Sequence, residues 1–244
     1  MKMIVHGSTG RMGQNLIRAL SKNHVLAAGV SVDQETNAAE NKYHSLPEFT
    51  GEADMIIDFS FHAAIGAVLE YAVARKLPVV IGTTGHTPEE KVMIAEAARS
   101  VPVFHAGNMS VGVALLVQLA KQTAKAFPDA EIEIIETHHD QKLDVPSGTA
   151  LMLADGIKSV RENATYNIGR PSNGKRTREE IGIHAIRLGN VVGIHEVLVS
   201  TGTQTITLKH EAHDRMLFAE GAVTAAEYLL GKEAGLYNME TMLG

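Results

Sequence analysis

Residues 7–13 of the chain read GSTGRMG, and this glycine triad decides the fold. A short apolar run at 2–5 precedes it, and apolar residues at helical spacing follow over 12–20. A strand, a glycine-rich turn and a helix in this order are typical of a dinucleotide-binding sheet. Glycines let the backbone approach a pyrophosphate, whose charge is stabilised at the helix N-terminus. The spacing is GxxGxxG rather than GxGxxG, and an ordinary strand-to-helix turn is the alternative interpretation.

Strand and helix signals alternate through the first hundred residues. We expect an α/β fold here, a Rossmann-like doubly wound parallel sheet whose strand carboxyl ends share one edge. The expected strands are 2–5, 25–32, 53–59, 78–81 and 101–104, and the expected helices are 12–20, 63–75 and 88–99.

The pattern changes near residue 109 to strands that alternate in polarity, which predicts a second α+β domain with an open antiparallel or mixed sheet. We expect a dinucleotide-binding domain at 1–109, completed by a C-terminal helix at about 213–244, and a second domain at 110–212. The polar, basic stretch 161–180 is long enough to suggest a mobile or partner-contacting segment. The expected strands are 131–136, 183–188, 191–199 and 204–210, and the expected helices are 112–127, 150–160 and 215–230.

The composition narrows the class of protein. A net charge of −6 argues against a general nucleic-acid binder, which would normally be basic. The absence of cysteine excludes disulfides, thiolate nucleophiles and cysteine-ligated zinc. No apolar run is long enough for a transmembrane helix, and the first residues pass directly into a strand, so no membrane association and a cytoplasmic location are expected.

Polar and glycine-rich turns follow three more of the expected strands. Asp33 lies where a ribose-binding acid is expected, although a solvated loop aspartate would look the same. The turns GTTG at 82–85 and AGNMS at 106–110 suit contacts to a nicotinamide ribose and carboxamide. No basic residue follows Asp33 directly, which favours NADH, while Arg11 or Lys42 could still serve NADPH.

Residues 137–149, THHDQKLDVPSGT, gather the chemistry of the second half in one loop. A PSGT sequence that enters a helix offers unpaired backbone N–H groups, and with the hydroxyls of Ser147 and Thr149 these suit a carboxylate. Lys142 supplies a mobile cation and His138 titrates near neutral pH, so either could exchange a proton with a dianionic substrate. Lys142 could instead be a surface lysine.

Other titratable residues have plainer interpretations. His139 could satisfy a backbone carbonyl, and Asp140 and Asp144 fit turn or cap positions. The paired histidines do not predict a metal, because neighbours on a strand point to opposite faces and no third ligand has a suitable spacing. The basic stretch 170–178 fits a solvated loop or an oligomer contact better than a phosphate site. Core or interface positions are expected for His184, His195, His210 and His213.

Six segments in this order resemble the 4-hydroxy-tetrahydrodipicolinate reductase family, also called dihydrodipicolinate reductase. The resemblance covers nearly the whole chain, and its specific part is HHxxK…PSGTA. It implies an NAD(P)H-dependent oxidoreductase of lysine and diaminopimelate biosynthesis that reduces 4-hydroxy-tetrahydrodipicolinate, with NADH or NADPH as cofactor and a homotetramer built on the second sheet. The segments are GSTGRMG, DFS at 58, GTTG at 82, GNMSVGV at 107, ETHHDQKLDVPSGTA at 136 and RLGNVVGIHEV at 187.

The resemblance implies roles for individual residues. His138 would be the catalytic acid/base and Lys142 the proton donor, His139 would contact the substrate, and Gly148 and Thr149 would hold a substrate carboxylate beside Ser147. The residues that would line the cofactor are Gly7, Ser8, Thr9, Gly10, Arg11, Met12, Gly82, Thr83, Thr84, Ala106, Gly107, Asn108 and Met109.

The chain departs from the family pattern in two places. Residues 59–62 read FSFH where the family has FT-x-P, and no basic residue follows Asp33. Two other functions remain open: a dehydrogenase that acts on aspartate or homoserine, and a cofactor-sensing module. A sensor would have no use for His138, Lys142 and PSGT together.

Overall fold

The computed structural model describes residues 1–20 and 23–244 and consists of two compact units. One unit comprises Met1–Ser110 and Arg215–Gly244, and the other comprises Val111–Asp214. Each unit has its own sheet and its own helices.

The sheet of the first unit is parallel throughout. Within the described residues it has seven strands in the order β12-β6-β5-β4-β1-β2-β3, so the chain winds outward in both directions from the β1–β4 pair. The predicted doubly wound parallel sheet is therefore confirmed. The strands are β1 (Lys2–His6), β2 (Val25–Val30), β3 (Lys42–Tyr43), β4 (Met55–Asp58), β5 (Val79–Ile81), β6 (Pro102–His105) and β12 (Gly235–Tyr237).

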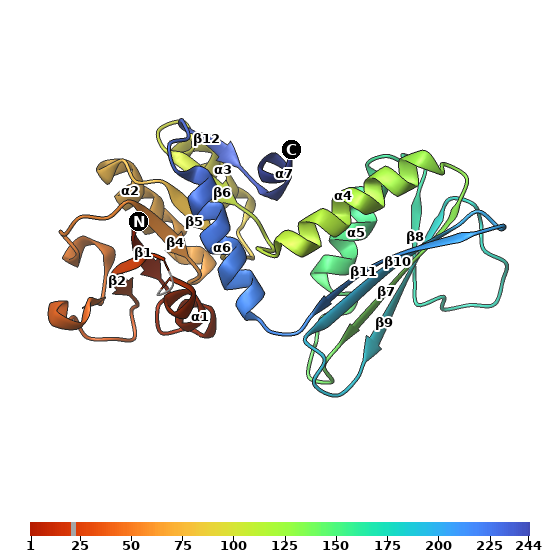
Figure 1. The fold of residues 1–244 in the computed structure, drawn as a ribbon, viewed down its shortest axis with the longest axis horizontal. Helices are drawn as coiled ribbons and strands as arrows, with labels where there is room; N and C mark the ends of the chain where they lie inside the picture. Colours follow the sequence, from red (N-terminus) through yellow and green to blue (C-terminus); the bar gives the residue numbers. More distant parts are fainter. Residues whose placement is uncertain (21–22) are drawn as a thin grey trace. The chain divides into compact units, whose positions relative to one another are not determined.

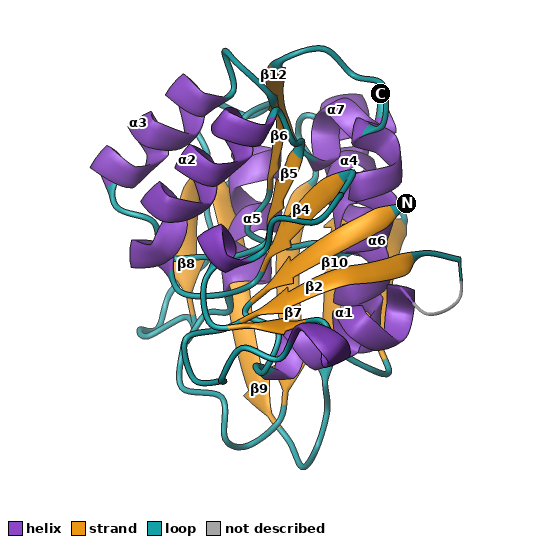
Figure 2. Ribbon diagram, turned by 90° about the vertical axis from the view of Figure 1, so that its left-hand side faces the viewer, coloured by secondary structure: helices purple, strands orange, loops and turns teal. Residues whose placement is uncertain are grey.

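Helices cover both faces of this sheet, which explains why every residue of β4 and β5 is buried and why all of them except Asp58 are apolar. Figure 2 shows α2 and α3 on one side of the strands and α1 and α6 on the other. Three short elements of this unit, β3, β12 and α7, were not expected from the sequence, since two to five residues are too few for a periodicity to show. The helices are α1 (Arg11–Leu20), α2 (Ile65–Arg75), α3 (Pro88–Ala97), α6 (Met216–Leu229) and α7 (Met239–Leu243), with 3-10 helices η1 (Ala38–Glu40), η2 (Leu46–Glu48) and η3 (His62–Ala64).

The second unit has a mixed sheet, as the alternating pattern predicts. Its described strands lie in the order β11-β10-β7-β9-β8, antiparallel from β11 to β7 and parallel from β7 to β8. Helices α4 and α5 lie along one face (Figure 1), and a core of residues such as Ile134, Val197 and Leu153 fills the space between. The elements are α4 (Val111–Ala126), β7 (Glu131–His138), α5 (Gly148–Lys158), β8 (Thr165–Ile168), β9 (Glu180–Arg187), β10 (Gly193–Ser200) and β11 (Thr205–Ala212).

Strand β7 carries polar residues on both of its faces. Ile132, Ile134, Glu136 and His138 are buried in alternation, while Glu133 on the opposite face is half-buried. A fully buried glutamate among isoleucines is costly unless it is paired, and Glu136 has partners on three sides. This strand therefore brings a charged group to the helix-covered face.

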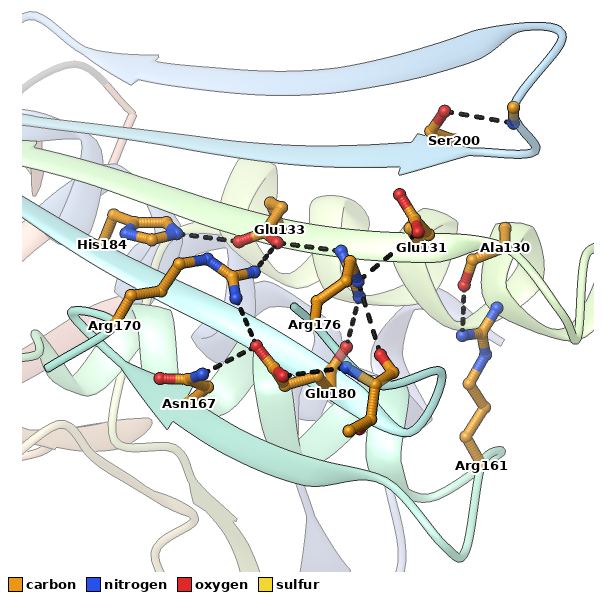
Figure 3. A network of polar contacts seen from close by, with 12 residues as sticks. Ala130, Glu131, Glu133, Arg161, Asn167, Arg170, Arg176, Glu180, His184 and Ser200 are labelled. Carbon is orange, nitrogen blue, oxygen red and sulfur yellow. Dashed lines mark hydrogen bonds and ion pairs between the residues drawn. The ribbon is translucent and has the colours of Figure 1, made fainter. Parts of the chain in front are cut away.

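Residues 170–178 form a loop, as the sequence predicts, but the longer stretch 161–180 also contains a strand. Strand β8 lies within residues 161–180 and pairs with β9. Arg170 and Arg176 form ion pairs with Glu133, and Arg170 also pairs with Glu180 (Figure 3). These arginines are held against the sheet because the carboxylates on β7 and β9 attract them.

Candidate active site

The glycine turn after β1 has the close packing that a dinucleotide site needs. Gly7 has a φ of +83°, and a Cβ at Gly13 would lie 2.1 Å from the carbonyl oxygen of Gly7. Only glycine allows α1 to start this close to the turn. The first-turn N–H groups of α1 have no partner within the helix and are suited to a pyrophosphate. The residues present thus fit a nicotinamide dinucleotide.

Asp33 lies three residues beyond β2, next to this turn. The hydroxyl groups of Ser31 and Thr9 donate hydrogen bonds to its Oδ1 atom over 2.5 Å and 2.7 Å. These bonds hold the pKa of Asp33 below its usual value, so the exposed side chain is a carboxylate at neutral pH. A carboxylate here can accept hydrogen bonds from a ribose diol and repels a 2′-phosphate. Lys42, the possible 2′-phosphate partner, forms an ion pair with Glu40.

A buried polar network occupies the point where the strand order reverses. His6 Nδ1 lies 2.7 Å from Asp58 Oδ1, and the hydroxyl groups of Ser60 and Thr83 donate to the same carboxylate over 2.6 Å each. Thr83 was expected to contact the cofactor, but its hydroxyl group donates to Asp58 and accepts from the backbone of Ser60. The role of the DFS segment in fixing this turn could not be predicted from the sequence.

The turn after β6 is stabilised from within and presents its backbone. Asn108 Oδ1 accepts a hydrogen bond from the N–H of Ser110 over 2.8 Å, and the side chain of Met109 is buried. The space beside the α-carbon of Gly107 is open, with no atom within 4 Å of a built Cβ. Of the expected cofactor residues in this turn, Gly107 therefore offers the most accessible backbone.

In the second unit, a buried carboxylate joins the residues with proton chemistry. His138 is the last residue of β7 and not a loop residue, so its ring points to the same face as Glu136. His138 Nδ1 donates a hydrogen bond to Glu136 Oε2. Glu136 Oε1 accepts from the backbone N–H of Ser147 over 3.0 Å, at the start of α5. One carboxylate thus links the histidine to the PSGT turn.

Arg187, at the end of β9, completes this cluster. Its Nη1 and Nη2 atoms each donate to one oxygen of Glu136 over 3.0 Å. Nη2 also donates to the carbonyl oxygen of Asp144 over 2.7 Å. No role for Glu136 or Arg187 is predicted from the sequence. The parallel pairing of β7 with β9, which aligns His138 with Arg187, could not be read from the sequence.

The expected carboxylate seat lies at the N-terminus of α5. Ser147 is the N-cap: its hydroxyl group accepts from the N–H of Ala150 over 3.2 Å and is hydrogen-bonded to His195 Nε2 over 3.1 Å. This hydroxyl group is buried and makes both of these hydrogen bonds within the protein. Gly148 is exposed with open space around its α-carbon, and Thr149 is half-buried.

Lys142 and His139 lie in the turn that follows β7. Lys142 Nζ forms an ion pair with Asp144 Oδ1 at 2.9 Å, which lowers the pKa of that carboxyl group. Asp144 therefore binds the side chain of Lys142 in addition to its place in the turn. The carbonyl oxygen of His139 accepts a hydrogen bond from the N–H of Lys142 over 3.2 Å, which closes the turn.

Burial and hydrogen bonds together set the pKa values of this cluster. Burial raises the pKa of Glu136, but the hydrogen bonds from Arg187, His138 and Ser147 outweigh it, so the pKa is below its usual value. Burial lowers the pKa of His138, with smaller contributions from Lys142 and Arg187, while Glu136 acts in the opposite direction. Burial and the neighbouring His138 lower the pKa of His195 to about 4.

The described residues contain no cluster of three or more histidine, aspartate or glutamate side chains arranged to hold a metal ion. None of the helices in the described part of the chain is long and apolar enough to cross a lipid bilayer.

Comparisons with known proteins cover the chain almost completely. Residues 1–109 match the family model "Dihydrodipicolinate reductase, N-terminus" and residues 112–243 match "Dihydrodipicolinate reductase, C-terminus". A 4-hydroxy-tetrahydrodipicolinate reductase from Caldanaerobacter subterraneus subsp. tengcongensis is 41% identical over 246 residues, with 100% of this chain and 98% of the relative covered. One from Clostridium tetani is 40% identical, with 100% and 97% covered.

A solved structure has the same fold. Dihydrodipicolinate reductase from Paenisporosarcina sp. TG-14, with dipicolinate bound, superimposes with a TM-score of 0.83 at 24% identity, and 98% of this chain and 97% of that chain are covered.

Proposed function

The chain belongs to the dihydrodipicolinate reductase family, and on that premise we propose how its residues reduce 4-hydroxy-tetrahydrodipicolinate with NADH or NADPH. The reaction is a step of lysine and diaminopimelate biosynthesis. It replaces a hydroxyl group by hydrogen, so one hydride and one proton enter and one water molecule leaves. The cofactor supplies the hydride. The chain must hold a dianion and supply the proton.

The main support for the proposal is that the carboxylate of Glu136 accepts hydrogen bonds both from His138 and from the backbone N–H of Ser147 at the start of α5. A proton-exchanging ring and a helix N-terminus suited to a carboxylate therefore lie side by side. In this proposal Gly148 and Thr149 bind one substrate carboxylate through the helix N-terminus, and His139 contacts the substrate.

His138 and Lys142 have different tasks in this proposal: Lys142 binds a substrate carboxylate and His138 supplies the proton. Lys142 is a mobile cation whose partner, Asp144, is more than half exposed, so the ammonium group can leave Asp144 for a substrate carboxylate. A dianion beside His138 favours its protonated form, which reverses the effect of burial on its pKa. His138 then donates the proton that leaves with the departing hydroxyl group.

For the first unit we propose that Gly7, Ser8, Gly10, Arg11 and Met12 surround the pyrophosphate. Asp33 with Thr9 would bind the ribose, which favours NADH. The turns at Gly82–Thr84 and Ala106–Met109 would hold the nicotinamide through their backbone groups. Residues 1–109 with the C-terminal part of the chain would form the cofactor domain, and 110–212 the substrate domain.

We also propose a homotetramer in the cytoplasm. In Figure 1, α4 and α5 cover one face of the mixed sheet, and the other face carries no helix of this unit. Residues on that face, such as Ile186, are nearly half exposed. Pairing of this face between copies would bury it, and light scattering at several concentrations measures the assembly.

The test of the proposed function is reduction of 4-hydroxy-tetrahydrodipicolinate, followed through the absorbance of the reduced nicotinamide. The wild-type chain is expected to consume NADH only when the substrate is present. A His138→Ala, Lys142→Ala double variant is expected to lose nearly all of this activity. Undiminished turnover in the folded double variant would contradict the assigned roles.

A further inference from the structure

Glu136 has no step of its own in the proposed mechanism, yet its carboxylate makes several polar contacts. Its side chain is fully buried, yet four hydrogen bonds reach its two oxygen atoms. Oε2 accepts from His138 Nδ1 and from Arg187 Nη1, and Oε1 accepts from the N–H of Ser147 and from Arg187 Nη2. Each oxygen thus holds one part of the site, and Arg187 spans both.

Arg187 extends this arrangement to the turn that carries Lys142. Its Nη2 atom donates to the carbonyl oxygen of Asp144 over 2.7 Å, and its Nε atom donates to the carbonyl oxygen of Lys142 over 3.4 Å. Arg187 comes from β9, whereas the turn follows β7, so the guanidinium group ties the turn to the sheet. His138, the Lys142 turn and the start of α5 all depend on this single ion pair.

The hydrogen bonds determine which nitrogen of His138 carries the proton. Glu136 accepts from three other N–H groups and is therefore an ionised carboxylate, which can only accept. Nδ1 of His138 must then be the donor, and in the neutral ring Nε2 is left without a proton. Nε2 of His138 faces Gly193. A Cβ on residue 193 would lie 3.1 Å from this nitrogen, so glycine at this position leaves space beside it.

We infer that Glu136 and Arg187 are positioning residues: Glu136 fixes His138 with its proton on Nδ1, which leaves Nε2 as the atom that exchanges protons, and Arg187 locks Glu136, His138 and the Lys142 turn together. The inference rests on the proposed function only where it gives Nε2 a catalytic task. The claim about the proton on Nδ1 rests on the geometry alone.

Charged groups from every neighbouring element face His138, and their effects have known signs. Burial lowers the pKa of His138, and the cations Lys142 and Arg187 lower it further, while Glu136 raises it. His195 on β10 has its ring 5.1 Å away, and Asp144 interacts with His138 across the turn. Removal of the charge on Glu136 must therefore lower the pKa of His138 further, because only Asp144 remains to oppose the cations.

The first test is made on the wild-type chain, with one variant used only to identify signals. Nitrogen-15 chemical shifts of the histidine rings in the wild-type chain report which nitrogen carries the proton in the neutral form. A His138→Gln spectrum identifies the signals of His138. The expected result is a proton on Nδ1. A neutral His138 with its proton on Nε2 would overturn the inference.

The second test uses Glu136→Gln, whose amide must choose an orientation. The N–H of Ser147 can only donate, so the amide oxygen is expected to face Ser147 and the NH₂ group to face His138. His138 Nδ1 then becomes an acceptor, the proton moves to Nε2, and the pKa of His138 falls. We expect kcat to fall about 100-fold or more, while dipicolinate affinity changes far less, because the carboxylate seat keeps its hydrogen bond.

Glu133→Gln is the matched control. Glu133 lies on the same strand but on the opposite face, where Arg170, Arg176 and His184 surround it much as Arg187 and His138 surround Glu136 (Figure 3). The two variants lose the same charge from comparable networks. Glu133→Gln is expected to reduce thermal stability without any change in the titration of His138.

The outcomes separate the inference from the proposed function. A folded Glu136→Gln chain in which His138 keeps the wild-type titration and tautomer would refute the inference, even if the enzyme is a reductase. A wild-type chain that fails to reduce the substrate would refute the proposed function, while the spectra would still test the inference. If the Glu136→Gln chain does not fold, the nitrogen-15 spectrum of the wild-type chain still tests the inference, because it shows which nitrogen of His138 carries the proton.

Discussion

His195 Nε2 lies 3.1 Å from Ser147 Oγ, so a buried histidine on β10 supports the N-cap of α5. His195 is almost inaccessible, and its Nδ1 atom has no hydrogen-bond partner among the described residues. Burial lowers its pKa to about 4 from 6.5. A protonated ring at this place would carry an uncompensated buried charge, which links the integrity of the carboxylate seat to pH.

The first prediction concerns stability against acid. Between pH 6.5 and 4 the unfolded chain binds a proton at His195 that the folded chain does not. The free energy of unfolding should therefore fall by about 3 kcal/mol as the pH is lowered through this window, and should be unaffected by His195 above it. In the His195→Gln variant the free energy of unfolding is expected to depend less on pH in this window. Denaturant titrations at several pH values measure that dependence. The exposed His44→Gln is the control, and equal slopes in both variants would contradict the prediction.

The second prediction is proton uptake on ligand binding. The pKa of His138 in the free protein is below its usual value because the ring is buried, so the ring is mostly neutral at pH 7. A bound dianion such as dipicolinate should raise that pKa and draw up to one proton from solution. Affinity should therefore weaken as the pH rises. Calorimetry in buffers of different ionisation enthalpy measures the uptake, and a His138→Gln chain with the same uptake would rule this explanation out.

The third prediction concerns the choice of cofactor. Asp33→Asn keeps the shape of the side chain but removes the carboxylate that would accept from a ribose diol. We expect kcat/KM for NADH to fall about 10- to 100-fold and the ratio of NADPH to NADH efficiency to rise. Glu35→Gln, two residues away and exposed, changes the net charge equally and should leave the ratio unchanged. Steady-state kinetics with both cofactors measures the ratio, and an unaltered ratio in Asp33→Asn would exclude Asp33 from the ribose site.

The fourth prediction compares two glycines of the expected cofactor turns. A Cβ at Gly13 would lie 2.1 Å from a backbone oxygen of the turn, whereas a Cβ at Gly107 would meet nothing within 4 Å. Gly13→Ala should destabilise the chain by about 1–3 kcal/mol and weaken cofactor binding, because α1 must move away from the turn. Gly107→Ala should leave the thermal midpoint within a degree or so of the wild type. Similar midpoints for both variants would mean that α1 can shift at little cost.

The fifth prediction concerns the carboxylate seat. Thr149→Val removes a hydroxyl group from the first turn of α5 with little change in volume, and dipicolinate affinity should fall about tenfold. Ser159→Ala removes a hydroxyl group just beyond the other end of the same helix and serves as the control. Binding titrations of both variants distinguish a local contact from a general weakening of α5. Equal affinities would show that backbone groups alone hold the ligand.

The sequence predicted the elements that are long and periodic. Continuous apolar runs such as 78–81 and 101–104 correspond to β5 and β6, since strands buried on both faces need no polar alternation. Strands β3, β8 and β12 were missed, because none of them is a continuous apolar run and each forms through pairing with a neighbouring strand. The ion pairs of the basic segment after α5 were not predicted for a related reason: Glu133, the partner of Arg170 and Arg176, is remote in sequence.

The sequence by itself determined the sheet-and-helix order, the glycine turn and the motif with His138, Lys142 and Gly148, because these depend on residues close together along the chain. Only the tertiary structure decided which remote residues bind and orient these groups. Glu136 meets Arg187 across 51 residues, and His195 meets Ser147 across 48. Such pairs form because β7 lies between β9 and β10 in the sheet, and strand order is set by packing of the whole unit, not by local pattern.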